Sequence, residues 1–472
     1  MRIGASPLLE SRAPAAERLL DSQRTASSAA PGVWAYRIVW WFAFLGPIGK
    51  LLLIPGAPNS FRFYYFLLPP AVLFFVGASA RKTLTALLPA FPLVIAVLLS
   101  AIFADPTVAK ESLTVSEQEG ASLPVLHALL FVSLLLFSTA AAQQIFRVGA
   151  EAKVRLVEAY MCGYFISLVC GWLFVVGRVT GLMSEDFISM FSITNDSQTL
   201  LNRQRFAPGS YPNEYGNVSS FMLSIIPLYF LTGMHLSERR APGRPVFGSI
   251  AVAIVAVPFT FMALILASTR AAFVSFVLAA AYVLGFEFLS RLRRLSVSRR
   301  WLTRGVFVCL ALGAAALISL PLLMKTDLGD EIVWRFKRVN EGMQDASQGE
   351  GSIQVRLDKW AEGERRFEKT PLIGSGFATH TCVHNTYLQL LYDMGIGGAS
   401  FFVAIMALLF VLGRRRLGGG VNPVFLNNDM RWRFLRYVRS LGLLHVFWFA
   451  ASNHNLDHHL TWFIAILALC VP

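Results

Sequence analysis

Long apolar runs separated by short polar segments make up most of the chain after residue 33. A helix needs about 20 consecutive apolar residues to cross the hydrocarbon core of a membrane. The stretches that meet or approach this length are 34–54, 62–79, 86–104, 123–146, 155–179, 214–234, 246–267, 271–289, 305–324, 386–412, 437–452 and 456–472. The pattern therefore predicts an all-α, polytopic integral membrane protein with about 12 transmembrane helices.

The composition agrees with this prediction. Of the 472 residues, 55% are hydrophobic and only 15% are charged, whereas a soluble domain is about 45–50% apolar and about 25% charged. These values exclude a soluble single-core fold, a disordered protein and a coiled coil. Residues 1–33 differ from the rest, because they are rich in Ala, Ser and Arg and lack an apolar run. We expect them to form a disordered cytoplasmic tail, not a signal peptide.

Lysine and arginine are concentrated in alternate loops, which is typical of the cytoplasmic side of membrane proteins. The two most basic linkers lie at 290–304 and 413–436. The alternation predicts that both termini are cytoplasmic and that the net charge of +14 is mainly a topology signal. The outer loops are then 105–122, 180–213, 325–385 and 453–457. Spans one to nine fall within 34–324, and spans ten to twelve fall within 386–472.

The outer loop 325–385 is long and nearly neutral, with nine basic and ten acidic residues. The excess positive charge is therefore not on the outer face, and nucleic acid is not an expected partner. Within this loop, apolar residues at helical spacing predict a helix over 353–369 that ends before Pro371. Arg356 lies on its basic side. This helix either rests on the membrane surface or binds an anionic ligand, since Arg can donate two hydrogen bonds to a phosphate.

Two histidines follow this helix, just before the next apolar run. His380 and His384, with Asn385, come after a flexible turn at Gly374-Ser375-Gly376. A histidine at this boundary is either a polar anchor or a general base, because its pKa lies near the working pH. In the second case Asn385 orients the imidazole or binds a sugar hydroxyl.

The other candidate residues also belong to the outer side. Arg203 and Arg205 precede an irregular Pro- and Gly-containing segment that leads to Asn213. They are either solvated loop residues or cations that bind phosphates. Arg270 interrupts the apolar run formed by two spans, and a charge at membrane depth is usually paired or functional.

The last outer loop is rich in histidine and contains His454. Its spacing matches no strong zinc pattern, so we expect hydrogen bonding to sugar or a polar cap, and no metal. The five cysteines are scattered and indicate neither a disulfide framework nor a CxxC site. All these candidates map to one face, although the topology was derived from other loops. This coincidence indicates an outward-facing site.

Several motifs occur in a particular order over residues 350–400. They are Arg356-Leu357 with Trp360, then Pro371–Gly376, then His384–Leu388, then Gly395–Gly398. This order and spacing resemble the O-antigen ligase and polymerase family of bacterial inner membranes. The segments around Arg205–Asn213 and Ser268–Arg270 are also similar to that family. His380 and the His-rich loop at 453–459 go beyond the part of the pattern that can be placed.

The resemblance implies a metal-independent glycan transferase that needs no cofactor and acts at the periplasmic face. Its donor is a glycan on undecaprenyl diphosphate, and its acceptor is a sugar hydroxyl of the lipid A core or of a carrier-linked repeat. Arg205, Arg270 and Arg356 then stabilise the departing diphosphate, and His384 accepts the proton of the acceptor. Arg203, Asn213, Asn385, His380 and His454 are the expected substrate-binding residues. Membrane lipid surrounds the spans.

Two other functions compete with this one. A flippase or other transporter for lipid-linked oligosaccharide is expected to carry ionisable residues near the midplane, where the chain offers mainly His445. A non-catalytic membrane subunit of a polysaccharide assembly complex would use the same arginines structurally. Within the transferase class, ligase and polymerase stay open, as does the choice between O-antigen, capsule and exopolysaccharide as the product.

Overall fold

The computed structural model describes the following residues: 30–49, 67–68, 71–72, 91–104, 124–146, 148–184, 187, 206–208, 212–232, 250–267, 269–292, 351–377, 385–415, 430–452 and 458–471. Across these ranges the chain is helical and forms no strand. The helices in chain order are α2 (Ala30–Ile48), α4 (Phe91–Ile102), α7 (Pro124–Phe146), α8 (Ala150–Val179), α10 (Pro212–Leu231), α12 (Ile250–Ala267), α13 (Arg270–Leu292), α16 (Gly351–Phe367), α17 (Thr386–Arg415), α19 (Met430–Ser452) and α20 (His459–Cys470).

The all-helical prediction is confirmed over the described residues. Every helix except α16 overlaps an apolar stretch that was expected to span a membrane. The expected span 305–324 lies outside the described residues, and so does nearly all of 62–79. Among the described helices, three are long and apolar enough to cross a membrane: His127–Phe146, Ala150–Arg178 and Thr386–Ile405. The total of twelve spans and the division of the chain between them stay predictions.

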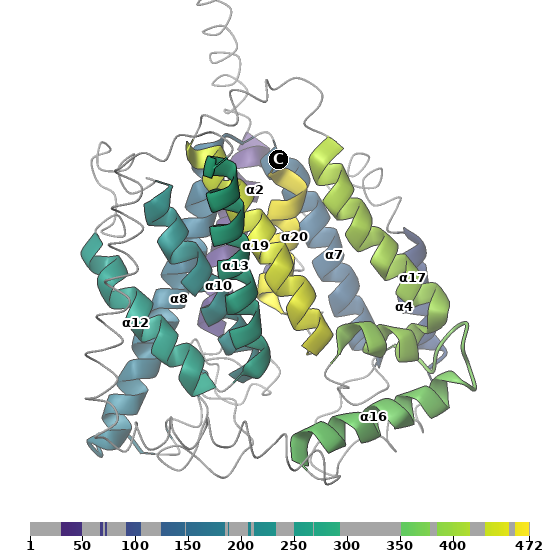
Figure 1. The fold of residues 1–472 in the computed structure, drawn as a ribbon. Coiled ribbons are helices and arrows are strands. Elements are labelled where there is room, and N and C mark those ends of the chain that lie inside the picture. The colour runs from purple at the N-terminus through teal and green to yellow at the C-terminus, as the bar shows by residue number, and fades with distance from the viewer. Residues whose placement is uncertain are drawn as a thin grey trace, which may run out of the picture.

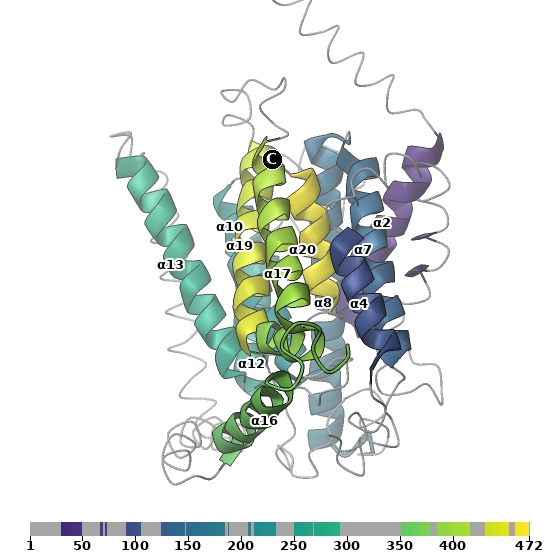
Figure 2. The same ribbon diagram turned by 90° about the vertical axis from the view of Figure 1, so that its right-hand side faces the viewer.

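Most helices stand side by side in one bundle, and α16 lies across its lower end (Figures 1 and 2). Within the bundle, α2 packs against α8, α7 packs against α20, and α10 packs against both α12 and α13. The helix α16 follows a different sequence pattern from the others, because charged residues occupy much of it. Its placement outside the bundle follows from that pattern, since those charges stay out of the apolar interior.

Hydrogen bonds join several helix ends at the upper end of the bundle. Lys153 Nζ donates to the carbonyl oxygens of Phe146 (3.0 Å) and Cys470 (2.9 Å). Tyr36 Oη, near the start of α2, donates to the carbonyl oxygen of Ala152 at 3.1 Å. The ends of α7 and α20 therefore lie beside the starts of α2 and α8. These are the ends that border loops predicted to be cytoplasmic.

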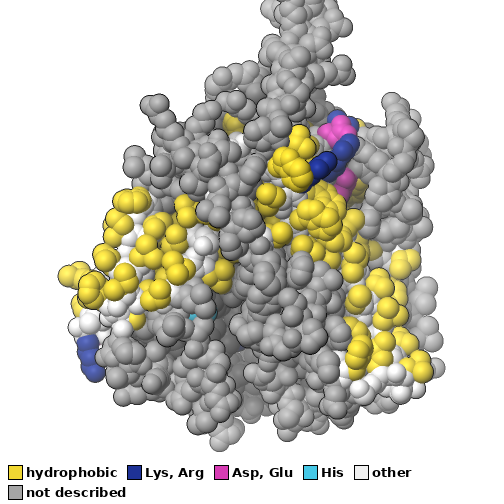
Figure 3. All heavy atoms as spheres, turned by 180° about the vertical axis from the view of Figure 1, so that it is seen from behind, with side chains coloured by type: hydrophobic (Ala, Val, Ile, Leu, Met, Phe, Trp, Pro, Cys, Tyr) yellow, Lys and Arg dark blue, Asp and Glu magenta, His cyan; other side chains and the backbone are white. Residues whose placement is uncertain are grey.

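Large apolar side chains cover much of the described surface. Seen from behind, hydrophobic side chains form broad areas, while charged side chains gather in small groups near the upper and lower edges (Figure 3). On α8, the exposed residues Ile166, Val169, Leu173 and Val176 recur at helical spacing. Such a continuous apolar stripe is unfavourable in water and suits contact with lipid. Together with the three long apolar helices, it marks the chain as a membrane protein.

The interior of the bundle holds hydrogen-bonded polar groups. His445 of α19 is fully buried, and its Nδ1 donates to the carbonyl oxygen of Leu441 at 2.8 Å. Its Nε2 lies 3.0 Å from Ser220 Oγ of α10, which in turn lies 3.1 Å from Ser275 Oγ of α13. Polar side chains that bond across helices hold them together where water is absent. This network therefore connects α10, α13 and α19.

Candidate active site

The site begins where α16 ends and the chain turns back toward α17. We call Pro371–Phe377 the crossing segment. The amide nitrogens of Ser375 and Gly376 donate to the carbonyl oxygens of Tyr392 and Asp393, both at 3.0 Å. In return, the amide of Ile396 donates to the carbonyl oxygen of Pro371 at 2.9 Å. The crossing segment is thus paired, backbone to backbone, with residues 392–396 of α17.

This pairing requires a break in α17. At Gly395 the backbone is not helical, with φ of 67° and ψ of −173°, and Figure 1 shows α17 changing direction along its length. A Cβ at position 395 would overlap the backbone of Leu372, and a Cβ at Gly374 would overlap the backbone of Asp393. Each of the motif glycines Gly374 and Gly395 therefore leaves room for the backbone of the opposite segment, which explains why both occur in the pattern.

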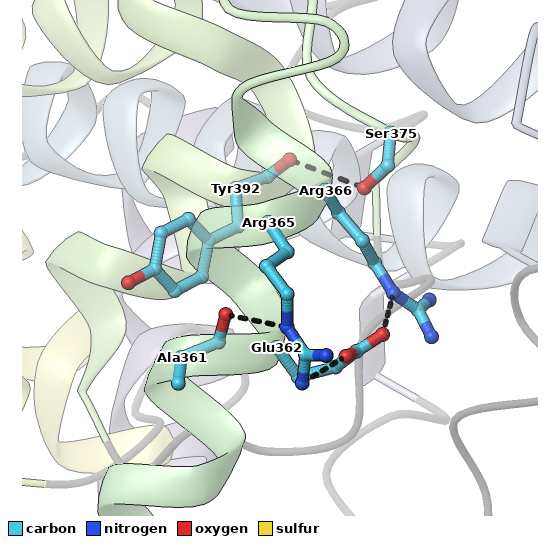
Figure 4. Close-up of polar contacts among 6 residues, drawn as sticks. All are labelled: Ala361, Glu362, Arg365, Arg366, Ser375 and Tyr392. Atoms are coloured by element: carbon cyan, nitrogen blue, oxygen red, sulfur yellow. Dashed lines mark hydrogen bonds and ion pairs between the residues drawn. The ribbon is translucent and has the colours of Figure 1, made fainter.

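The helix α16 docks on the same part of α17. The ring centroids of Phe367 and Tyr392 lie 6.4 Å apart. One turn earlier, Glu362 forms ion pairs with Arg366 (2.7 Å) and Arg365 (2.9 Å), and Figure 4 shows its carboxylate between the two guanidinium groups. The Arg366 side chain is only 14% exposed, whereas that of Arg365 is 71% exposed. Glu362 therefore holds the largely buried Arg366 side chain in place, while the Arg365 side chain faces outward.

Arg356 is the one predicted arginine whose side chain the structure describes. It lies on α16 and is half-buried. The helix predicted over 353–369 is confirmed as Gly351–Phe367. Its apolar stripe does not join the core, because Leu357 stays 45% exposed and Trp360 is half-buried.

Asn385 forms the start of α17. Its side-chain Oδ1 accepts hydrogen bonds from the backbone amides of Tyr387 (3.0 Å) and Leu388 (3.1 Å). This is the geometry of an N-cap, in which a side-chain oxygen satisfies free amides of the first turn. Asn385 thus fixes the helix that begins directly after His384. His384 and His380 themselves lie outside the described residues.

The helix α19 connects the starts of α13 and α17. Tyr387 Oη, in the first turn of α17, donates to the carbonyl oxygen of Phe447 at 3.2 Å. On the next residue, Trp448 Nε1 donates to the carbonyl oxygen of Ala271, in the first turn of α13, at 2.9 Å. Arg270 begins α13, and its side chain lies outside the described part. The backbone at Arg270 and the helix that follows His384 are therefore held by two adjacent residues of α19.

The segment around Asn213 joins this region from the other side. Thr269 Oγ1 donates to Asn213 Oδ1 at 3.5 Å, so the half-buried Asn213 lies beside the turn that precedes Arg270. Arg203 and Arg205 lie outside the described residues. The next residue, Phe206, is described: its amide donates to the carbonyl oxygen of Leu266 in the last turn of α12, at 3.1 Å. Arg205 thus directly precedes a residue whose backbone is bonded to Leu266, four residues before Arg270.

In the His-rich loop at 453–459, the structure describes His458 and His459, and both are buried. His454 lies outside the described residues, between α19 and α20. In the described part of the chain, no group of three or more His, Cys, Asp and Glu side chains could hold a metal ion.

A buried carboxylate near the crossing was not singled out from the sequence. Asp393 is 2% exposed, and both of its carboxylate oxygens accept from Gln389 Nε2, at 3.2 and 3.1 Å. Its backbone carbonyl also accepts from Ser100 Oγ of α4 at 2.8 Å. The signal was an acidic residue inside an apolar run with a glutamine four residues before it.

Residues 253–403 match the family model described as O-antigen ligase. Over these residues, less than half of its length, the chain is similar to the O-antigen ligase family. This match confirms the family resemblance found in the motifs. The matched residues include α13, α16 and most of α12 and α17, so they contain the crossing segment and the positions of Arg270, Arg356 and His384. The contacts of Asn213, Phe447 and Trp448 come from outside them. No curated protein matches the chain.

Proposed function

We propose that the protein is a membrane-bound glycan transferase. It joins a glycan carried on undecaprenyl diphosphate to a sugar hydroxyl, at the periplasmic face of the bacterial inner membrane, during the synthesis of cell-surface polysaccharide. The O-antigen ligase family domain supports the class of reaction. The observation that carries the proposal is the hydrogen bonding of the first turns of α13 and α17 to neighbouring residues of α19. The first turn of α13 contains Arg270, and the first turn of α17 follows His384 closely in sequence.

The proposed reaction is a displacement at the anomeric carbon of the donor. The acceptor oxygen forms the new bond to that carbon, and the bond to the diphosphate breaks, with its electron pair leaving on the phosphate oxygen. His384 takes the proton of the acceptor hydroxyl. Arg205, Arg270 and Arg356 stabilise the charge that develops on the leaving diphosphate, where fixed cations in a site of low dielectric are most effective. The chemistry proposed for these residues uses no metal and no cofactor.

Contacts of the segments next to each arginine support this assignment. The Arg205 backbone leads directly into Phe206, which is bonded to the last turn of α12. Arg270 begins the next helix after that turn. Arg356 belongs to α16, which docks on α17 through Phe367 and Tyr392. These contacts support the proposal that the three arginines, which come from separate segments, act at one end of the bundle.

Polar residues around the arginines are proposed to bind the glycans. Asn213 and Asn385 are both half-buried at this end of the bundle. Because Asn385 Oδ1 caps α17, its amide nitrogen is the atom proposed to donate to a sugar oxygen. Arg203, His380 and His454 complete the proposed binding set.

The transporter alternative gains no support from His445. A transporter needs ionisable groups near the midplane that can change partners. Both ring nitrogens of His445 are engaged by Leu441 and Ser220 inside the helix bundle. His445 therefore acts as a structural connection between α19 and α10.

A deletion strain complemented with plasmid-borne variants tests the proposal. The strain's glycans are resolved by gel, and its carrier lipids are extracted. Single repeats left on the carrier or on the lipid A core identify a polymerase, and long chains left on undecaprenyl diphosphate identify a ligase. His384→Ala is expected to lower product formation by about 10²–10⁴-fold, the usual contribution of a general base. His127→Ala, on the exposed start of α7, is expected to restore normal product.

Two outcomes contradict the proposal. Normal product from a well-expressed His384→Ala variant removes the histidine from the mechanism. Lipid-linked repeats trapped on the cytoplasmic side of the deletion strain indicate a flippase, and the catalytic roles then fall. Equal protein levels of all variants in the membrane fraction separate loss of activity from loss of protein.

A further inference from the structure

The crossing segment presents two large apolar side chains outward. Leu372 is 75% exposed and Ile373 is 68% exposed. Neither side chain can fold inward by a small loop movement, because Pro371 and Gly376 on either side are hydrogen-bonded to the backbone of α17. Gly374 and Gly395 bring the two backbones into direct contact. The two side chains are therefore held outward by a fixed backbone.

Other exposed apolar residues lie on the adjoining elements. Ile396, which bonds to Pro371 through its amide, is 51% exposed. At the end of α4, Ile102 and Phe103 are 64% and 77% exposed. The end of α4 is joined to the same place, because Ser100 Oγ donates to the carbonyl oxygen of Asp393. We call these residues the apolar rim: Ile102, Phe103, Leu372, Ile373 and Ile396.

The apolar rim continues a surface that runs up the bundle. On α4, Leu99 and Ile95 are exposed one and two turns above the rim. On α17, Phe401 and Val403 are exposed beyond Ile396. Both helices are apolar, and α17 includes one of the described segments long enough to cross a membrane, so this surface suits contact with lipid. The rim is thus its lower border, beside the charged helix α16.

We propose that the apolar rim inserts into the membrane and is covered by lipid acyl chains at the boundary between hydrocarbon and water. Leu372 and Ile373 then act as a wedge that sets the depth of the crossing segment. The docked helix α16 is placed just outside the hydrocarbon, where the outward-facing Arg365 reaches water and lipid headgroups. Insertion accounts for apolar side chains that are large, adjacent and rigidly exposed, because apolar surface leaves water favourably.

Spin labels can measure the surroundings of the rim directly. The full chain, with its five cysteines replaced by alanine, is reconstituted in nanodiscs of phosphatidylethanolamine and phosphatidylglycerol. Leu372→Cys and Ile373→Cys are labelled and compared with Val403→Cys as the lipid reference and Arg365→Cys as the water reference. Collisions with oxygen report lipid, and collisions with a water-soluble nickel complex report water.

The expected result is that the labels at 372 and 373 collide with oxygen several-fold more than with nickel, as at 403. Labels that match position 365 overturn the proposal, because the rim then faces water. Labels that meet neither reagent also overturn it, because protein then covers the rim. A photo-reactive residue at 373 in the otherwise native chain gives an independent measurement, with lipid adducts expected by mass spectrometry. These outcomes do not depend on catalysis, so they are distinguishable from failure of the proposed function.

Discussion

Single residues determine how closely the crossing segment approaches α17. Gly395 combines φ of 67° with ψ of −173°, a region that is essentially restricted to glycine and costs other residues about 1–3 kcal/mol. Its missing side chain also lets the backbone of Leu372 pass against it. The same residue therefore satisfies a conformational and a packing requirement, and no other residue type meets both.

We expect Gly395→Ala to destabilise the purified protein by at least about 1–3 kcal/mol, because alanine is strained at this φ and overlaps the crossing segment. Thermal unfolding in detergent measures the change. Gly285→Ala is the matched control, since a Cβ there has nothing within 4 Å and an ordinary helical φ. The control should be as stable as the native chain, or slightly more so. Unchanged unfolding of Gly395→Ala would contradict the tight backbone pairing.

At the scale of elements, α19 acts as a support for two other helices. The carbonyl oxygen of Phe447 accepts a hydrogen bond from α17, and the side chain of Trp448 donates one to α13. The buried His445 adds a connection to α10 one turn earlier. These bonds fix the first turn of α13, which contains Arg270, relative to the first turn of α17, which comes shortly after His384. In enzymes, a displacement of about 1 Å at reacting groups can cost about 10²-fold in rate.

Removing one of these hydrogen bonds should therefore lower activity more than stability. Tyr387→Phe deletes one donor and keeps the ring, whereas Trp448→Phe deletes one donor and replaces the indole with a smaller aromatic ring. The lost hydrogen bond costs about 0.5–1.5 kcal/mol in folding. We expect glycan product to fall by about tenfold or more in each variant, through kcat, while the unfolding temperature changes little. Trp41→Phe, on the exposed surface of α2, is the control. Full activity of both Trp448→Phe and Tyr387→Phe would show that α19 does not position the site.

At the scale of the whole molecule, two groups of described polar contacts lie at opposite ends of the bundle. Lys153 and its carbonyl partners lie at one end, while Asn213, Asn385 and the crossing segment lie at the other. Most of the described buried residues between them are apolar. The basic loops predict that the first end is cytoplasmic.

Labelling from one side of the membrane tests this orientation. Arg155→Cys and Arg365→Cys place thiols at opposite ends, on side chains that are 52% and 71% exposed. A membrane-impermeant thiol reagent is expected to label Arg365→Cys in intact spheroplasts and Arg155→Cys only after lysis. The native chain, treated in parallel, gives the background from its own cysteines. The reverse pattern would invert the topology, and equal labelling from one side would refute a spanning bundle.

The sequence by itself determined where the described helices lie and which family residues 253–403 resemble. Helix positions follow from local run length, because a chain in lipid must satisfy its backbone hydrogen bonds within each segment. The motif order identified the family because it is read along the chain. Even the amphipathic helix ending before Pro371 was predictable from its own spacing.

Only the tertiary structure decided which segments meet. Asn385 was expected to contact substrate or imidazole, and its oxygen proved to cap α17. The apolar run from residue 386 predicted one span, but its helix breaks at Gly395 to accept the crossing segment. Trp448 and Ala271 are far apart in sequence, so no local pattern links them. These features depend on contacts between distant residues, which hydrophobic periodicity does not encode.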